Sequence, residues 1–271
     1  PTVDALTFAG DHGIDVVNMS FYVDPWLYNC AANPADSPAE QREQRTIIRA
    51  TQRALNYARA RGVTLVSALG NENTDMGAPT FDDTSPDYPP DAAHERTIDN
   101  SCIDVPAESD GVISISATGP TGRKAYYSNY GTEQTDLAAP GGDFFDTPGG
   151  AGDAGDPANL ILAPEGLDAA NTWGDVDENG DPTSDLVIKD HGALYQFLQG
   201  TSMAAPHATG VAALVVATYG VPDRGRGGLT LSPDRVEQIM RRTATRTACP
   251  VPATQHYFDD APEFDATCVG T

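Results

Sequence analysis

The sequence has few basic residues, no long apolar run and only four cysteines. Sixteen Lys and Arg stand against 39 Asp and Glu among 271 residues, a formal net charge of −23. Such a charge repels nucleic acid and anionic membranes, so we expect neither as a partner. No apolar stretch reaches the roughly 20 residues that a helix needs to cross a bilayer. The composition therefore favours a globular protein, and the length suits one sizeable domain.

The cysteines lack the pairing that is typical of a zinc site. No two of them form a C-x-x-C pair, and an even number without that pair favours disulfides in an oxidising compartment. Of three possible pairings we favour Cys30 with Cys102, which ties two insertions, and Cys249 with Cys268, which closes a short local loop. We therefore expect a secreted protein. The chain opens on Pro1 without a signal peptide, as a processed form or an excerpt would.

The most distinctive stretch surrounds Ser202. Gly200-Thr201-Ser202 runs into the small and apolar residues 203–216, which predicts a loop that feeds the first turn of a buried helix. At that turn, free backbone N–H groups and the helix dipole favour the negative charge that develops when a serine oxygen attacks a carbonyl. Gly-Thr-Ser alone is more typical of an ordinary helix cap. The whole stretch 200–210 favours a nucleophile.

Hydrophobic periodicity predicts the elements before this helix. Apolar residues at helical spacing indicate a helix over 3–9, and the apolar run 14–20 indicates a buried strand. Ser37-Pro38-Ala39-Glu40 is a capping box that opens a long helix to Gly62, and residues 63–68 form a second buried strand. Helix followed by strand, twice, implies parallel strands with right-handed crossovers.

The stretch 200–210, GTSMAAPHATG, resembles almost letter for letter the nucleophile motif of the subtilases, the subtilisin-like serine proteases. The resemblance implies that Ser202 forms the acyl-enzyme. Leu69-Gly70-Asn71-Glu72-Asn73 is similar to the family's Gly-Asn-Glu element, which implies that the Asn71 side chain donates to the oxyanion. Residues 127–131 and 137–141 match further landmarks in the family's order, so the resemblance covers residues 1 to about 245.

The resemblance also implies a substrate cleft. The end of the first strand would pair with the substrate backbone through Ser20, Phe21 and Tyr22. One wall of the pocket for the residue before the scissile bond would consist of Ala68, Leu69 and Gly70. The family usually has glycines where this chain has Tyr22 and Val23, so we expect a narrower cleft or a bulge at this edge.

Two motifs of the family are missing. A serine nucleophile needs a histidine base and an acid that orients it, and subtilases carry both upstream of the serine. The chain has five histidines outside the family's context: His12, His94, His191, His207 and His256. We therefore expect a partial catalytic domain, nearly inactive alone, whose Asp and His lie on a preceding segment or a separate chain.

Two functional classes follow from these observations. The first is a secreted serine endopeptidase that acts on polypeptide substrates. The alternative is a non-catalytic subtilase-like scaffold for binding or assembly. An intact Ser202 and Asn71 favour the first, because a scaffold has no physical need for either.

The expected fold class is α/β, with a mostly parallel sheet, helices on both faces and long acidic loop insertions. We place the insertions at about 24–37, 73–110 and 143–199, and an irregular disulfide-bearing tail at 247–271. The whole chain 1–271 is expected to be one partial domain.

The third insertion carries a candidate calcium loop. Its oxygen ligands, spaced as in the opening of an EF-hand, would be Asp175, Asp177, Asn179 and Asp181. Leu186 stands where an EF-hand has its bidentate Glu, so a standard EF-hand is not expected. A structural calcium held by other carboxylates is one interpretation, and a solvated acidic turn is the other. The chemistry itself is expected to need no cofactor.

Overall fold

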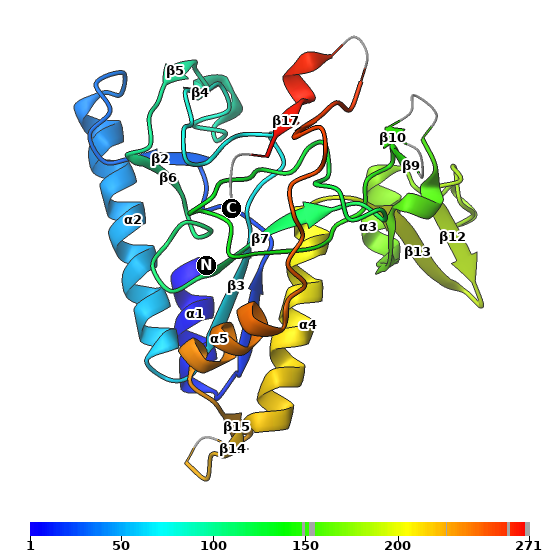
Figure 1. The fold of residues 1–271 in the computed structure, drawn as a ribbon. Helices are drawn as coiled ribbons and strands as arrows, with labels where there is room; N and C mark the ends of the chain where they lie inside the picture. The colour runs from blue at the N-terminus through cyan, green and yellow to red at the C-terminus, as the bar shows by residue number, and fades with distance from the viewer. Residues whose placement is uncertain (148–149, 152–154, 226, 259–260, 269–271) are drawn as a thin grey trace.

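The centre of the protein is a four-stranded parallel sheet in the order β1-β3-β7-β8, seen in the computed structural model of Figure 1. The structure describes residues 1–147, 150–151, 155–225, 227–258 and 261–268. The four strands are β1 (Val16–Met19), β3 (Thr64–Ala68), β7 (Ile113–Thr118) and β8 (Leu137–Pro140). Parallel strands with helices on both faces confirm the predicted α/β class.

Helices α1 (Thr2–Asp11) and α2 (Pro38–Arg59) cover one face of the sheet (Figure 1). The predicted capping box begins α2: the Glu40 N–H donates to Ser37 Oγ over 3.3 Å, and the Ser37 N–H donates to Glu40 Oε2 over 2.7 Å. Leu55 of α2 packs with Leu65 of β3 at zero exposure. This burial fixes the helix against the strand.

Helices α4 (Thr201–Tyr219) and α5 (Pro233–Thr243) pack on the other face. The first turns of α4 present alanines to β3, β7 and β8, and Ala204 and Ala205 are fully buried. Such small side chains let the helix approach the sheet closely. A short hairpin of β14 (Val221–Pro222) and β15 (Leu229–Thr230) joins the two helices. None of the helices in the described ranges is both long and apolar enough to cross a membrane.

Residues 73–110 pack into the body of the protein, although their Pro-rich polar sequence predicted a surface insertion. They form β4 (Phe81–Asp82), the 3₁₀ turn Pro90–Ala92, β5 (Arg96–Thr97) and β6 (Cys102–Asp104). Strand β6 pairs with β2 (Tyr28–Cys30) of the first insertion, and the predicted Cys30–Cys102 disulfide joins the two. Met76, Ile98 and Cys102 share a buried cluster with Leu27 and Leu69.

Arg96 explains how this polar segment is buried. Its side chain has zero exposure and forms ion pairs with Asp36, at 3.1 Å, and with Asp82. It also donates to the Tyr28 carbonyl over 2.8 Å, and its guanidinium carbon lies 4.7 Å from the centre of the Trp26 ring. A buried cation with two carboxylate partners satisfies polar groups that would otherwise oppose folding.

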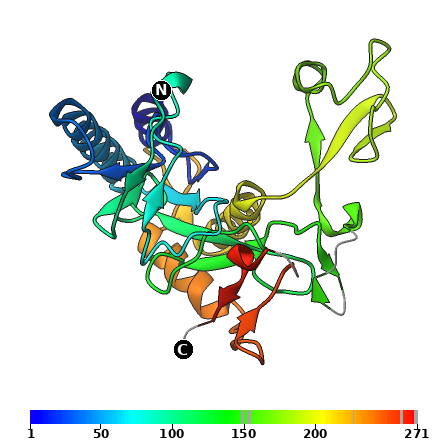
Figure 2. The same ribbon diagram turned by 90° about the horizontal axis from the view of Figure 1, so that it is seen from above.

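Residues 143–199 are also more ordered than a loop insertion, and much of this segment projects from the body as an arm (Figures 1 and 2). Its elements are β9 (Asp146–Thr147), β10 (Gly150–Ala151), a 3₁₀ turn (Pro157–Asn159), β11 (Ile161–Glu165), α3 (Leu167–Trp173), β12 (Val187–Asp190) and β13 (Ala193–Leu198). Strands β11, β13 and β12 form an antiparallel sheet. Its small core contains Ala170, Val176, Val187 and Leu194. Residues 148–149 and 152–154 of this insertion lie outside the described residues.

Within the described residues, the tail 247–271 has little regular structure. It contains β16 (Thr254–Gln255), β17 (Ala266–Thr267) and a 3₁₀ turn (Pro262–Phe264). The second predicted disulfide, Cys249–Cys268, links the two ends of this segment. Residues 259–260 and 269–271 lie outside the described residues.

Candidate active site

Ser202 is the second residue of α4, in the first turn of the helix. Gly200 precedes the helix with φ +152°, a conformation that only glycine adopts readily. Its N–H donates to the Gly141 carbonyl over 2.9 Å, which fixes the start of the helix beside the end of β8. Ser202 is partly buried. The nucleophile candidate therefore lies where unpaired helix N–H groups and the helix dipole favour an anion.

Asn71 is held against this turn by Thr201. Asn71 Oδ1 accepts two hydrogen bonds from Thr201, one from the backbone N–H at 2.8 Å and one from Oγ1 at 2.9 Å. Thr201 Oγ1 in turn accepts from the Gly70 N–H at 3.1 Å, and Thr201 is fully buried. With its oxygen bound to Thr201, the Asn71 amide keeps its Nδ2 hydrogens for another acceptor. Our sequence reasoning assigned no role to Thr201, although it lies next to Ser202 in the motif.

Asn129 shapes the turn that carries Asn71. Its Nδ2 donates to the Leu69 carbonyl at 3.0 Å, and its Oδ1 accepts from the backbone N–H groups of Glu72 and Thr74. Gly70 adopts φ +106°, and a Cβ there would lie 2.3 Å from Asn129 Nδ2. The turn therefore requires a glycine beside Asn129. Residues 127–131 resemble a landmark of the family, but that resemblance does not indicate this role of Asn129.

The predicted substrate edge leaves the sheet at the carboxyl end of β1. Ser20 Oγ donates to the Ser202 carbonyl over 3.0 Å, so this edge contacts the backbone of Ser202. Phe21 is 47% exposed, and the Tyr22 hydroxyl donates to Asp87 over 2.5 Å. Strand β1 ends at Met19, which places these three residues just after the regular strand.

The predicted pocket wall is only partly open. Gly70 is partly buried, Ala68 is buried in the main core, and Leu69 has zero exposure among the apolar side chains of the 73–110 segment. The Leu69 side chain therefore stabilises the fold, and its backbone is also engaged, because the N–H donates to the Ile115 carbonyl and the carbonyl accepts from Asn129 Nδ2.

The comparison with known proteins decides the family. The family model described as the subtilase family matches residues 2–261. The chain belongs to the subtilase family.

Similar proteins include the extracellular basic protease of Dichelobacter nodosus, which is 30% identical over 196 residues. That match covers 72% of this chain and 22% of the relative, so the chain spans about a fifth of that protein's length. Subtilisin DY of Bacillus licheniformis is 24% identical over 243 residues, 90% of this chain and 54% of that protein. The structure of a lanthipeptide protease, at 22% identity, has a TM-score of 0.56 over 91% of this chain and 58% of that one. This likeness shows the subtilisin-like fold.

The histidines of this subtilase lie in other settings. His207 Nδ1 lies 2.8 Å from the Met203 carbonyl on an exposed face of α4, and His12 stacks on Phe8 at the amino end of β1. His191 is in the turn between β12 and β13, and its side chain is 95% exposed. The remaining two, His94 and His256, lie in the 73–110 segment and the tail. Within the described residues, none of the five hydrogen-bonds to the Ser202 side chain.

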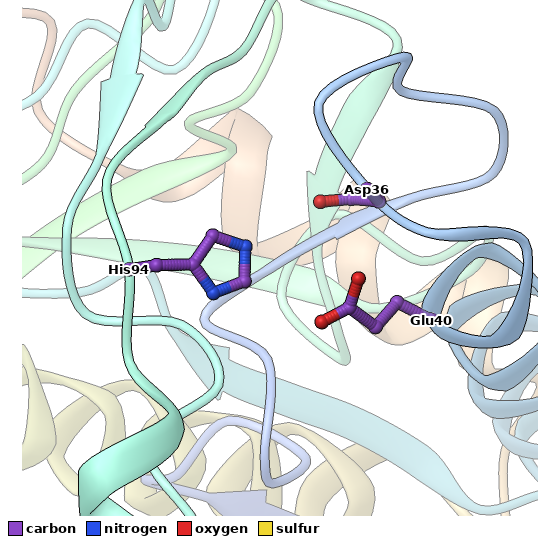
Figure 3. Close-up of side chains that lie close together, drawn as sticks. All are labelled: Asp36, Glu40 and His94. Carbon is purple, nitrogen blue, oxygen red and sulfur yellow. The ribbon is translucent and has the colours of Figure 1, made fainter.

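One group of side chains outside the Ser202 region could offer metal ligands. Asp36, Glu40 and His94 bring their ligand atoms within 4.8 Å of one another (Figure 3). Asp36 already binds Arg96 and accepts from Gln44 Nε2 at 2.8 Å, while Glu40 accepts from the N–H of the helix cap. The bonds of Asp36 connect the start of α2 to the 90–96 segment, so this group has a structural role.

The candidate calcium loop is closed by other contacts. Asp177 Oδ1 accepts from the backbone N–H groups of Asn179 and Asp181, and the Lys189 ammonium binds Asp181 Oδ1 at 2.9 Å. Asp175 Oδ2 accepts from a glutamine of β13. The three carboxylates are not among the described groups whose ligand atoms gather within 4.8 Å. Calcium at this loop stays a prediction.

Proposed function

We propose that the chain is the nucleophile-bearing part of a secreted serine endopeptidase that cleaves peptide bonds through an acyl-enzyme on Ser202. The observation that carries the proposal is the set of three hydrogen bonds by which Thr201 joins residues 70–71 to the turn of Ser202. Membership of the subtilase family supports a serine protease. Relatives named as extracellular proteases and the two disulfides support secretion.

In this proposal Ser202 Oγ attacks the carbonyl carbon of the scissile peptide bond. The carbonyl oxygen becomes an oxyanion, which accepts hydrogen bonds from Asn71 Nδ2 and the Ser202 N–H. Such donors stabilise the transition state because Thr201 and Asn129 hold them in place before the charge develops. A histidine base takes the serine proton and gives it to the leaving amine, and water then hydrolyses the acyl-enzyme.

The base and the acid that orients it would come from a segment outside these 271 residues. Two features support such a partner. Helix α4 carries no Asp, Glu, Lys or Arg, yet its outer face is open, with Val211 at 47%, Leu214 at 68% and Tyr219 at 59% exposure. A helix that is apolar on all sides is normally covered. Strand β1 is the end strand of the described sheet, so one of its edges is available to a further strand.

The test compares the 271-residue chain alone with a longer form, in which the proposed segment with the base and the acid is present. The longer form should hydrolyse peptides, and Ser202→Ala should abolish that activity. The chain alone should be nearly inert. An oxyanion site without a base retains only a rate enhancement of about 10³- to 10⁴-fold over the uncatalysed reaction in water. A serine-directed phosphonate should label the longer form at Ser202. A longer form that neither cleaves peptides nor reacts with the phosphonate would favour the non-catalytic scaffold instead.

A further inference from the structure

A cavity of about 380 Å³ begins one residue from Asn71. Residues 72–75 form one side of it, residues 78–84 form another, and Leu27 and Tyr28 complete the wall. Glu72 connects the cavity to the candidate active site, because Glu72 Oε2 accepts the Asn71 N–H at 2.9 Å. A cavity of this size beside Asn71, the proposed oxyanion donor, can accommodate a substrate side chain.

The charge of this cavity has one sign. Four carboxylates line it, Glu72, Asp75, Asp82 and Asp83, and no Lys, Arg or His is among the lining residues. Asp82 shares the buried Arg96 with Asp36, and the other three carboxylates have no cation among the lining residues. Asp83 is exposed and makes no hydrogen bond or ion pair within the described ranges.

Further carboxylates lie along the substrate edge. Asp87 accepts from the Tyr22 hydroxyl, and burial together with the nearby charges of Asp87, Asp24 and Glu72 raises the pKa of that hydroxyl. Asp24 lies close enough to Asp87 that burial and their repulsion raise the pKa of Asp24. The acidic region thus extends from the cavity to the edge where we place the substrate backbone, and a cation that approaches it would relieve this repulsion.

We infer that this cavity receives the side chain of a lysine or arginine that precedes the scissile bond. The inference rests on the proposed function. Leu27, Pro79 and Phe81 offer apolar surface to the methylene stem, and the carboxylates accept hydrogen bonds from the cationic head. Our sequence reasoning could give no cleavage preference, because these residues come from three segments that only the fold brings together.

The experiment uses the longer, active form and two peptides that differ only before the scissile bond, one with lysine and one with norleucine. The two side chains share a methylene stem of similar length and differ in charge. The ratio of their kcat/KM values, lysine over norleucine, should exceed about tenfold at low salt and fall as salt is added. Asp83→Asn should lower this ratio by roughly three- to tenfold, since it removes one carboxylate and keeps the shape. Asp91→Asn is the matched control, because Asp91 is exposed and does not line the cavity.

The outcomes separate this inference from the proposed function. Hydrolysis of both peptides with an equal or higher kcat/KM for norleucine would overturn the inference and leave the endopeptidase intact. The inference would also be overturned if Asp83→Asn and Asp91→Asn lowered the lysine-to-norleucine ratio of kcat/KM equally. Absence of hydrolysis together with absence of phosphonate labelling would overturn the proposed function, and the inference with it.

Discussion

Thr201→Val tests whether the geometry of the candidate site matters for catalysis. Valine keeps the shape and the backbone N–H of Thr201, so one hydrogen bond to Asn71 Oδ1 remains. The substitution removes Oγ1, which donates the second hydrogen bond to Asn71 and accepts from the Gly70 N–H. Thr201 is fully buried, so water does not replace the lost partner freely. Asn71 should then hold its amide less rigidly toward the oxyanion.

The magnitude follows from the bonds that are lost. Loss of the whole donor, as in Asn71→Leu, should lower kcat by roughly 10² to 10³, the range found for such a donor in subtilisin, a member of the same family. Thr201→Val removes one of the two hydrogen bonds that hold Asn71 Oδ1. If the activation free energy rises by the net value of that bond, about 1 kcal/mol, kcat should fall roughly fivefold. The orphaned Gly70 N–H should also reduce the free energy of unfolding by about 1–3 kcal/mol. KM should change little, because the lost interaction acts on the transition state.

Steady-state kinetics of the longer form provide the assay, with unfolding in urea to measure stability. Because Thr201 acts through Asn71, the double variant Asn71→Leu with Thr201→Val should be no slower than Asn71→Leu alone. Thr218→Val is the control on the same helix, since its exposed hydroxyl donates to the Leu214 carbonyl and, within the described residues, has no other partner. Additive losses in the double variant, or an effect of Thr201→Val confined to KM, would refute this reasoning.

Two further predictions concern stability. Burial raises the pKa of Glu108 to about 7 and also raises that of Asp104, so the folded protein retains protons that the unfolded chain releases. The free energy of unfolding should therefore fall as pH rises from about 4.5 to 7, by on the order of 2–3 kcal/mol for Glu108. Urea titrations at several pH values measure this fall. Glu108→Gln should make the free energy of unfolding depend less on pH, whereas the exposed Asp110→Asn should not. If Glu108→Gln leaves the pH dependence unchanged, Glu108 is not its source. Calcium at ten times its Kd should raise the free energy of unfolding by about 1.4 kcal/mol, and should therefore raise the melting midpoint more than magnesium does at equal ionic strength. Asp177→Ala should abolish the difference, and equal shifts with both ions would exclude a calcium site there.

Sequence reasoning succeeded where the signal is local. The capping box at Ser37 and Glu40 needs only four residues, and both of its hydrogen bonds are present. The apolar runs at 14–20 and 63–68 form parallel strands because only a sheet covered on both faces buries them. The family of the chain was recognisable from the small-residue motif around Ser202, which is continuous in sequence.

The remaining features depend on contacts between distant segments. Arg96 gave no signal in the sequence, because its two carboxylate partners lie 60 and 14 residues away. Hydrophobic periodicity detects patterns of apolar residues and cannot identify a segment that is buried around an ion pair. Residues 73–110 were therefore expected at the surface. The role of Asn129 was hidden for the same reason, since it holds a turn 57 residues earlier.

Oxyanion stabilisation and proton transfer in a serine protease depend on different parts of the fold. Asn71 lies against the first turn of α4, and three hydrogen bonds of Thr201 hold residues 70–71 to the turn that contains Ser202. In our proposal, one strand end and one helix start therefore supply the oxyanion donors. Proton transfer needs a base at hydrogen-bond distance from Ser202, which in our proposal comes from a segment that covers α4 and extends the sheet beyond β1. If so, adding that segment should raise the rate of Ser202 acylation while leaving the hydrogen bonds between Asn71 and Thr201 as they are.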